Sequence, residues 1–467
     1  MKKNGKTLML FLIILFLMVL TWFIPTGTFN EGAFVSNGTN PAGIFDLFVF
    51  VYYAFTYKAM DIIYILMVGG AYGVLSNVAA YKKCVDKAAK LVKKYDVISL
   101  LIVTLLIGLF TSMTNEFIVA LGIIPFIVTV FLKAGKDKLT ATSAGFGGLF
   151  IGIIGKTFST YGITTLIDTF ELTVTTNMVY KVILFILAYG LYNLFAILHM
   201  KKIGSVDHTK YDAYCTEVIE KEKKGSKKKA VWPFVTVSVI TLLIGIFAFI
   251  SWETSFGITL FNDLYKSITS VELLGNPIFK NLLGSATAFG SWTTLFLNVV
   301  ILIGLIIVAL VDRMPVKSFI TNFQNGVRKI YKLAFIYVLV NCVYVLFYYF
   351  PIGITILNAL LGKGSFNVLS LFIVGFVGLF LAVDYELVGS ALASYLAVLF
   401  AEKAAETTLV LYLGMSIAAF IVPTSYILML ALTYLDIPYT KWLKYIWKFL
   451  LTMVAAALIV ILLVCVF

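Results

Sequence analysis

Two short polar clusters interrupt long apolar stretches, and they limit the folds open to this chain. The first is Ser112-Met113-Thr114-Asn115-Glu116 and the second is Asp384-Tyr385-Glu386. Each lies between two apolar arms of about 15–18 residues, which are too short for two comfortable membrane spans and suit a re-entrant hairpin. Acidic groups at membrane depth are costly, so they usually face a cavity, a partner or a substrate. One such cluster in each half of the chain predicts two hairpins in an inverted repeat.

The composition places these clusters in a membrane protein. The chain has 467 residues, of which 61% are hydrophobic and only 13% are charged. We therefore predict an all-α polytopic membrane protein. The net charge is +13, and the lysines gather in short loops beside apolar runs. This positive-inside pattern indicates a lipid bilayer, and not nucleic acid, as the neighbour. The two histidines and four cysteines lack metal-site spacing, so no metal site and no cofactor are predicted.

The order of apolar and basic segments predicts two halves. The layout is an N-terminal repeat half, a basic cytoplasmic linker and a C-terminal repeat half, at 1–200, 201–230 and 231–467. Each half contains a hairpin followed by a broken span, at about 97–133 and 141–167 in the first and about 366–401 and 407–433 in the second. With about nine transmembrane helices besides the hairpins, the N-terminus is cytoplasmic and the C-terminus external. The expected location is the plasma membrane.

Polar residues at the hairpin tips and helix breaks are the candidate binding residues for substrate or ions. They are Ser112, Thr114, Asn115, Glu116, Lys156, Thr157, Ser159, Asp384, Glu386, Ser390, Thr424 and Ser425. Hydroxyl, amide and backbone dipoles at half-helix N-termini suit a carboxylate, and the acids suit a cationic group. An ammonium at mid-membrane, as at Lys156, could replace a bound cation, grip a carboxylate or exchange a proton.

Each of these assignments has a structural alternative. Lys156 could snorkel to an interface, and Glu116 could simply cap a helix. Asp384 and Glu386 could be ordinary loop acids. The Ser and Thr hydroxyls could bond to their own helix backbone.

Several segments resemble a known transporter family. They are Leu20-Thr21-Trp22-Phe23-Ile24-Pro25-Thr26-Gly27-Thr28-Phe29, Val68-Gly69-Gly70-Ala71-Tyr72-Gly73, Ile421-Val422-Pro423-Thr424-Ser425 and Ile437-Pro438-Tyr439-Thr440-Lys441-Trp442-Leu443. In order and spacing they are similar to YfcC-like transporters of the ion transporter superfamily, which also includes the anaerobic dicarboxylate carriers and the AbgT group. The resemblance implies a homodimer whose mobile transport region moves, like an elevator, against a scaffold.

The chain departs from that family at its polar positions. Lys156-Thr157 stands where the family often has Asn-Pro, and Gly414-Met415-Ser416 stands where it often has Gly-Asp-Gly. Several polar candidates for a sodium site are therefore missing. Sodium coupling stays open, and proton coupling or exchange fits the residues better.

Three functions are weighed. The first is a secondary transporter or exchanger of a small carboxylate-bearing metabolite, such as the amino acids arginine and ornithine, because Lys156 accompanies three intramembrane acids. The second keeps the fold but carries an anionic mono- or dicarboxylate, with Lys156 as the clamp. The third is a membrane-embedded enzyme, for which catalytic histidine, metal or paired aspartate motifs are missing from the sequence. We therefore predict that the chain is not an enzyme.

Overall fold

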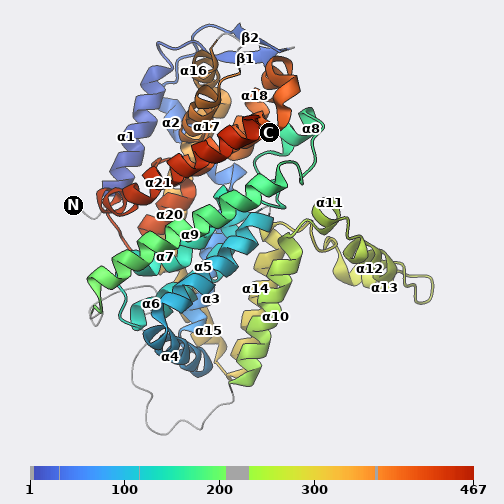
Figure 1. The fold of residues 1–467 in the computed structure, drawn as a ribbon. Helices are drawn as coiled ribbons and strands as arrows, with labels where there is room; N and C mark the ends of the chain where they lie inside the picture. Colours follow the sequence, from blue (N-terminus) through green and yellow to red (C-terminus); the bar gives the residue numbers. More distant parts are fainter. Residues whose placement is uncertain (1–4, 31, 115, 207–230, 363–365, 467) are drawn as a thin grey trace.

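The computed structural model describes residues 5–30, 32–114, 116–206, 231–362 and 366–466, and helices dominate these segments (Figure 1). Asn115 lies outside the described residues. The first half contains α1 (Gly5–Leu20), α2 (Ile44–Tyr57), α3 (Ala59–Leu75), α4 (Ala79–Lys94), α5 (Asp96–Met113), the 3₁₀ helix η1 (Phe117–Gly122), α6 (Ile124–Lys133), α7 (Lys138–Ile154), α8 (Thr164–Thr169) and α9 (Met178–Ile203).

The described part of the second half consists of helices joined by loops. It contains α10 (Trp232–Phe249), α11 (Trp252–Phe256), α12 (Leu260–Thr269), α13 (Ile278–Leu283), α14 (Thr294–Val311), α15 (Val316–Tyr349), α16 (Ile352–Leu361), α17 (Val368–Ala382), α18 (Tyr385–Phe400), the 3₁₀ turn η2 (Ala401–Lys403), α19 (Ala404–Ala418), α20 (Tyr426–Tyr434) and α21 (Tyr439–Val466). Helices α11 to α13 project from one side of the molecule (Figure 1).

The prediction of an all-α polytopic membrane protein is confirmed. Seven helical segments in the described part are long and apolar enough to cross a membrane, or eight if the bent pair α2–α3 counts as one span. The prediction was about nine spans, and α1 and α7 are apolar but shorter than eighteen residues. The seven segments are Asp96–Met113, Met178–Ile203, Trp232–Phe249, Thr294–Val311, Val316–Tyr349, Tyr385–Ala418 and Tyr439–Val464.

Three local features differ from the sequence-based expectation. A small antiparallel hairpin of β1 (Gly27–Asn30) and β2 (Ala33–Ser36) pairs Gly27 with Ser36 and Asn30 with Ala33. The basic residues from Lys317 to Lys332 are part of the same helix as the apolar span that follows, which makes α15 a single helix of 34 residues. Helices α2 and α3 meet at Lys58 with a bend of 70°.

Close helix packing inside the second half depends on glycine. A Cβ atom at Gly375 of α17 would lie 2.1 Å from the Leu411 carbonyl oxygen of α19. A Cβ atom at Gly414 of α19 would lie 2.2 Å from the Phe372 carbonyl oxygen of α17. Within a bilayer, helices associate mainly through such close van der Waals packing. These two glycines therefore hold the arm before the second polar cluster against the following span.

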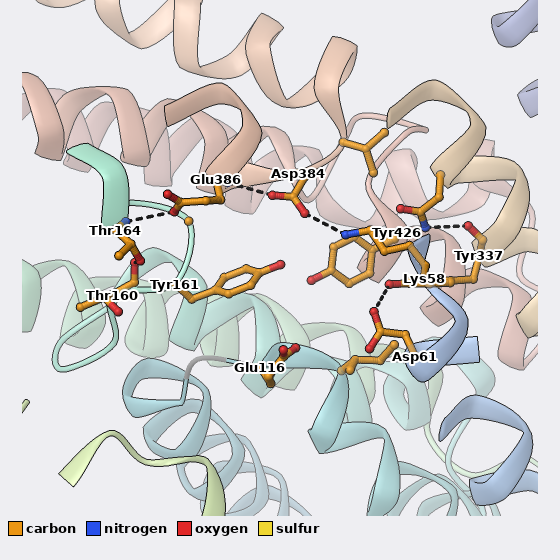
Figure 2. Close-up of a pocket in the computed structure, with 14 residues that line it drawn as sticks. Lys58, Asp61, Glu116, Thr160, Tyr161, Thr164, Tyr337, Asp384, Glu386 and Tyr426 are labelled. Atoms are coloured by element: carbon orange, nitrogen blue, oxygen red, sulfur yellow. Dashed lines mark hydrogen bonds and ion pairs between the residues drawn. The ribbon is translucent and has the colours of Figure 1, made fainter. Parts of the chain in front are cut away.

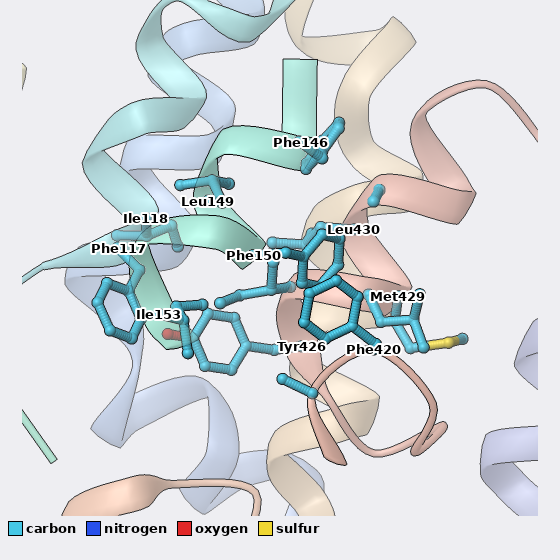
Figure 3. Close-up of a cluster of buried hydrophobic side chains, with 14 of the residues drawn as sticks. Phe117, Ile118, Phe146, Leu149, Phe150, Ile153, Phe420, Tyr426, Met429 and Leu430 are labelled. Carbon is cyan, nitrogen blue, oxygen red and sulfur yellow. The ribbon is translucent and has the colours of Figure 1, made fainter. Parts of the chain in front are cut away.

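An apolar cluster joins the two halves of the chain (Figure 3). Phe150 of α7 stacks on Phe420, which follows α19, with ring centroids 4.4 Å apart. Both side chains are fully buried, and Ile118 and Tyr426 belong to the same cluster. Because Ile118 and Tyr426 also face a cavity, this cluster forms the floor of the site described below.

A polar contact fixes the start of α7 outside the apolar core. The side chain of Asp137 caps α7 by accepting from the backbone N–H of Thr140 at 3.1 Å, and its other oxygen lies 3.1 Å from His199 Nε2. Burial raises the pKa of the Asp137 carboxyl, but the hydrogen bonds from His199 and Thr140 outweigh it and lower the pKa to about 2. The carboxylate therefore stabilises the folded chain at neutral pH.

Candidate functional site

The first polar cluster is bonded to the break after α7. The carbonyl oxygen of Ser112 accepts from the backbone N–H of Thr157 at 3.1 Å and from that of Phe158 at 3.2 Å. The Thr157 hydroxyl also donates to the Ser112 hydroxyl at 3.2 Å. Irregular backbone at membrane depth needs such partners, since lipid supplies none. The end of α5 and the break between α7 and α8 therefore stabilise one another.

The second half contains one comparable contact. The Thr424 hydroxyl, in the break between α19 and α20, donates to the carbonyl oxygen of Phe380 near the end of α17 at 2.8 Å. The two partners are 44 residues apart, against 45 for Ser112 and Thr157. The matching contacts and spacings support the predicted repeat, which stays a proposal.

The clusters and breaks surround a cavity of about 270 Å³, here called the central cavity (Figure 2). Six parts of the chain contribute to it: the residues after α5, the break before α8, the α17–α18 junction, the start of α20, the α2–α3 bend and α15. The lining residues are Lys58, Asp61, Glu116, Ile118, Thr160, Tyr161, Gly162, Thr164, Tyr337, Asn341, Val383, Asp384, Glu386 and Tyr426.

Lys58 links the α2–α3 bend to the second polar cluster. Its Nζ lies 3.2 Å from Asp384 Oδ2 and 4.7 Å from the centre of the Tyr344 ring. The side chains of Lys58 and Asp384 are 21% and 14% exposed. The other oxygen of Asp384 caps α18, because Oδ1 accepts from the backbone N–H of Glu386 at 2.9 Å. One carboxylate thus serves both an ion pair and a helix cap.

The remaining acids of the central cavity differ in how they are held. Tyr337 donates its hydroxyl to Asp61 Oδ2 at 2.6 Å. Glu386 accepts from the backbone N–H of Thr164 at 3.0 Å and from that of Thr165 at 2.8 Å, and also from the Thr165 hydroxyl. Glu116 faces the cavity below Lys58 and Asp384 (Figure 2).

The central cavity is strongly acidic. Its lining contains one lysine and four carboxylates, which gives a formal net charge of −3. Tyr161 and Tyr426 point toward one another across it (Figure 2). A space of this size, bounded by charged groups and aromatic rings, suits one small polar molecule.

Comparison with known proteins identifies the family. Residues 6–466 match the family described as "DcuC: C4-dicarboxylate anaerobic carrier". The chain belongs to this family. This confirms the resemblance to the anaerobic dicarboxylate carriers and the prediction of a transporter. The chain is a multi-pass protein of the lipid bilayer that carries a small molecule. A comparison with curated proteins gave no match.

Two solved structures are similar along nearly the whole length of the carrier. The crystal structure of the Alcanivorax borkumensis YdaH transporter is 15% identical in sequence, with 98% of each chain covered and a TM-score of 0.45. The Neisseria gonorrhoeae MtrF structure, which is titled as illuminating a class of antimetabolite efflux pumps, is 12% identical, with 98% of this chain and 94% of that chain covered and a TM-score of 0.38.

The structure separates the carrier's predicted site residues into three groups. Glu116, Asp384 and Glu386 line the central cavity. A second group holds backbone in place and does not line the cavity: Ser112, Thr114, Thr157, Ser159, Thr424 and Ser425. The third group is Ser390, which is exposed and donates to the Leu387 carbonyl of its own helix.

Lys156 is the exception among the predicted residues. It does not snorkel to an interface, because its side chain is 2% exposed. It is also absent from the lining of the central cavity, and it lines a smaller cavity instead, with its Nζ 5.7 Å from the centre of the Tyr161 ring. Lys156 was predicted to act beside the acidic residues, but in this structure it does not line the same cavity as they do.

Sequence reasoning missed Lys58 and Asp61. Both lie between the apolar stretches of α2 and α3, and that position is itself a signal of charge at membrane depth. The aromatic members of the site, Tyr161, Tyr337 and Tyr426, carry no comparable signal in a chain with 26 tyrosines.

Proposed function

We propose that this carrier is a secondary transporter or exchanger of a cationic amino acid, such as arginine or ornithine. The observation that supports the proposal is the formal charge of −3 on the lining of the central cavity. A cationic side chain would reduce the repulsion among these carboxylates, whereas a dicarboxylate would increase it. We also infer that the chain is not an enzyme.

The helix N-termini at the cavity support the same conclusion. In a carrier of anions, free backbone N–H groups at such positions would be the natural partners of substrate carboxylates. Here Asp384 accepts from the first backbone N–H groups of α18, and Glu386 accepts from those of α8. The chain's own carboxylates therefore occupy the positions that a second substrate carboxylate would need.

The lining also offers a place for each end of an amino acid. Asp61 and Glu116 lie on the side of the cavity away from Asp384 and would hold a guanidinium or ammonium group (Figure 2). Lys58, at the junction of α2 and α3, would bind the α-carboxylate of the substrate and would give up part of its ion pair with Asp384 to do so. Glu116 is the residue we expect to carry a proton if transport is coupled to protons.

The mechanism proposed is elevator-type alternating access. The two polar clusters and the two helix breaks would move together with the substrate, because hydrogen bonds join them within each half. Lys58 and Tyr337 lie on α2–α3 and α15 and would belong to the scaffold. The Lys58–Asp384 ion pair then crosses the boundary between moving and fixed parts. We further propose a homodimer, as implied by the family resemblance.

The positions of α1 and α21 support the orientation that we propose. Lys6 of α1 bonds Asp436 at 3.0 Å, so α1 begins beside the start of α21. Helix α21 then runs across the molecule to the C-terminal end (Figure 1). With the basic linker in the cytoplasm, the N-terminus is cytoplasmic and the C-terminus external in the plasma membrane.

The second candidate function is transport of a C4-dicarboxylate, which the family description favours. In that case Lys58 would be the carboxylate clamp, and several of the cavity acids would have to be protonated during binding. Arginine and succinate therefore distinguish the two candidates directly.

Ligand-dependent thermal unfolding of the purified carrier tests the proposal. At about 100 times its Kd, a ligand adds about 2.7 kcal/mol of stability. Arginine should raise the Tm, and succinate should not. Glu116→Gln should weaken the arginine effect by about tenfold in apparent Kd, because one charged partner is lost. Glu402→Gln, at an exposed position outside the cavity, is the control. A Tm rise with succinate alone would favour the dicarboxylate carrier.

A further inference from the structure

A second, much smaller cavity lies beside the central cavity and is lined by two lysines. Its volume is about 20 Å³, which is enough for a single water-sized particle. The lining residues, from α7, α8, α9 and α19 and the loops between them, are Ile154, Lys156, Ile163, Ile167, Leu172, Thr173, Thr176, Asn177, Lys181, Ala405, Thr408, Leu409 and Tyr412. We call it the lysine cavity.

Lys156 reaches this cavity without a hydrogen-bonding partner. Its side chain is 2% exposed, and among the described residues no acceptor bonds its Nζ. The Nζ lies 4.8 Å from the centre of the Tyr412 ring and 5.7 Å from that of Tyr161. Two aromatic faces at these distances favour an ammonium but do not supply a hydrogen bond. A buried amine in this position calls for a further partner.

Lys181 approaches the same cavity from α9. Its side chain is 9% exposed, and its Nζ donates to the Val174 carbonyl oxygen at 2.8 Å. An ammonium has three N–H donors, so this bond uses one of them. The two lysines therefore bring positive charge and N–H donors to one small space. A water molecule there could accept a hydrogen bond but could not balance the charge.

No carboxylate lines the lysine cavity within the described part of the chain. Glu386 belongs instead to the lining of the central cavity, where the backbone N–H groups of Thr164 and Thr165 donate to its oxygens. The positive charge of the lysine pair is thus not balanced locally by protein.

We propose that the lysine cavity binds one small monovalent inorganic anion, such as chloride, between Lys156 and Lys181. A cavity of about 20 Å³ favours a monatomic anion over carboxylates and phosphate, each of which has several heavy atoms. The charge of the two ammonium groups favours an anion over water. The polar groups of Thr173, Thr176, Asn177 and Thr408 complete a lining with hydroxyl and amide groups.

The anion site would act on the transport site through Tyr161. This residue contacts Lys156 with its ring and also lines the central cavity. An anion that holds Lys156 in place would keep Tyr161 positioned against the substrate. The anion is bound to the protein in this scheme and is not the transported substrate, so the proposal does not depend on which metabolite the carrier moves.

Thermal unfolding of the full-length protein in chloride or in gluconate, at equal ionic strength, tests the proposal. Gluconate is too large for the cavity, so chloride should raise the Tm saturably by about 2 °C over gluconate. Lys156→Gln and Lys181→Gln should each abolish this difference. Lys6→Gln is the matched control, because Lys6 is also 9% exposed but bonds Asp436 elsewhere. Its Tm should fall while the chloride effect persists.

The proposal is overturned if the wild-type protein shows no difference between chloride and gluconate, or if Lys156→Gln keeps the full effect. Should a lysine variant fail to fold, anomalous scattering from wild-type crystals grown in bromide decides the question. A bromide peak between Lys156 and Lys181 supports the site. Density for water alone at saturating bromide contradicts it.

Discussion

The ion pair between Lys58 and Asp384 makes the sharpest prediction about stability. Lys58→Met removes the positive charge and keeps most of the side chain, while Asp384→Asn removes the negative charge and keeps the ability to cap α18. The first change takes the formal charge of the central cavity from −3 to −4, and the second takes it from −3 to −2. Two neutralising substitutions in one ion pair should therefore have unequal effects.

The structure gives the size of each effect. At a separation of 3.2 Å and an effective dielectric constant of about 20, the gross attraction is about 5 kcal/mol. Desolvation offsets part of it, and with side chains 21% and 14% exposed we place the cost of breaking the pair at about 2 kcal/mol, between surface and buried pairs. Lys58→Met should cost more than this, about 3 kcal/mol, because the carboxylates lose their cation. Asp384→Asn should cost about 1 kcal/mol, since Lys58 keeps Asp61 nearby.

Thermal unfolding of the two variants and the double variant measures this asymmetry. The double variant should be more stable than Lys58→Met alone, because the second change relieves repulsion created by the first. If Asp384→Asn is as destabilising as Lys58→Met, or if the double variant is the least stable of the three, the electrostatic account of the central cavity is wrong.

Three further predictions concern other contacts. Gly414→Ala should destabilise the carrier by about 1–3 kcal/mol, because the added Cβ would lie 2.2 Å from a backbone oxygen of α17. Gly190→Ala has open space around it and should be neutral or stabilising. Thermal unfolding of the two variants tests this difference. The pKa of Asp137 is lowered to about 2, so its carboxylate contributes about 2 kcal/mol to the free energy of unfolding. This contribution is fully present above the unfolded pKa of about 4 and is lost as the pH falls through about 2. Asp137→Asn should therefore make stability depend less on pH in acid, and an unchanged stability–pH curve would contradict the assignment. Tyr337→Phe removes the hydrogen bond to Asp61 and should lower the free energy of unfolding by about 1–2 kcal/mol. It should also weaken the stabilisation by arginine, which ligand-dependent thermal unfolding measures. If arginine stabilises the variant as much as the wild type, Asp61 does not take part in binding the substrate.

The sequence predicts the parts of the fold that depend on local pattern. Long apolar stretches identify the membrane class, and isolated charges at membrane depth identify Glu116, Asp384 and Glu386, all of which line the central cavity. Such groups stand out because few other places in a bilayer tolerate them. The prediction that these residues bind substrate remains to be tested.

Other features depend on tertiary packing that pattern does not contain. Lys58 is at a 70° bend, but no proline or glycine marks the bend in the sequence between Tyr57 and Ala59. Lys156 interrupts an apolar stretch as the acids do, yet tertiary packing places it in the lining of a different cavity. Thr157 and Thr424 were reasonable ligand candidates, and their hydroxyls instead bond the ends of neighbouring helices.

Labelled-arginine counterflow in proteoliposomes, in sodium-free buffer, tests the central claim most directly. The account predicts arginine accumulation driven by internal arginine, which external ornithine chases and succinate does not affect. If labelled arginine does not accumulate, and labelled succinate accumulates when the liposomes contain succinate, the claim is contradicted. Lys58 would then be the clamp of a dicarboxylate carrier.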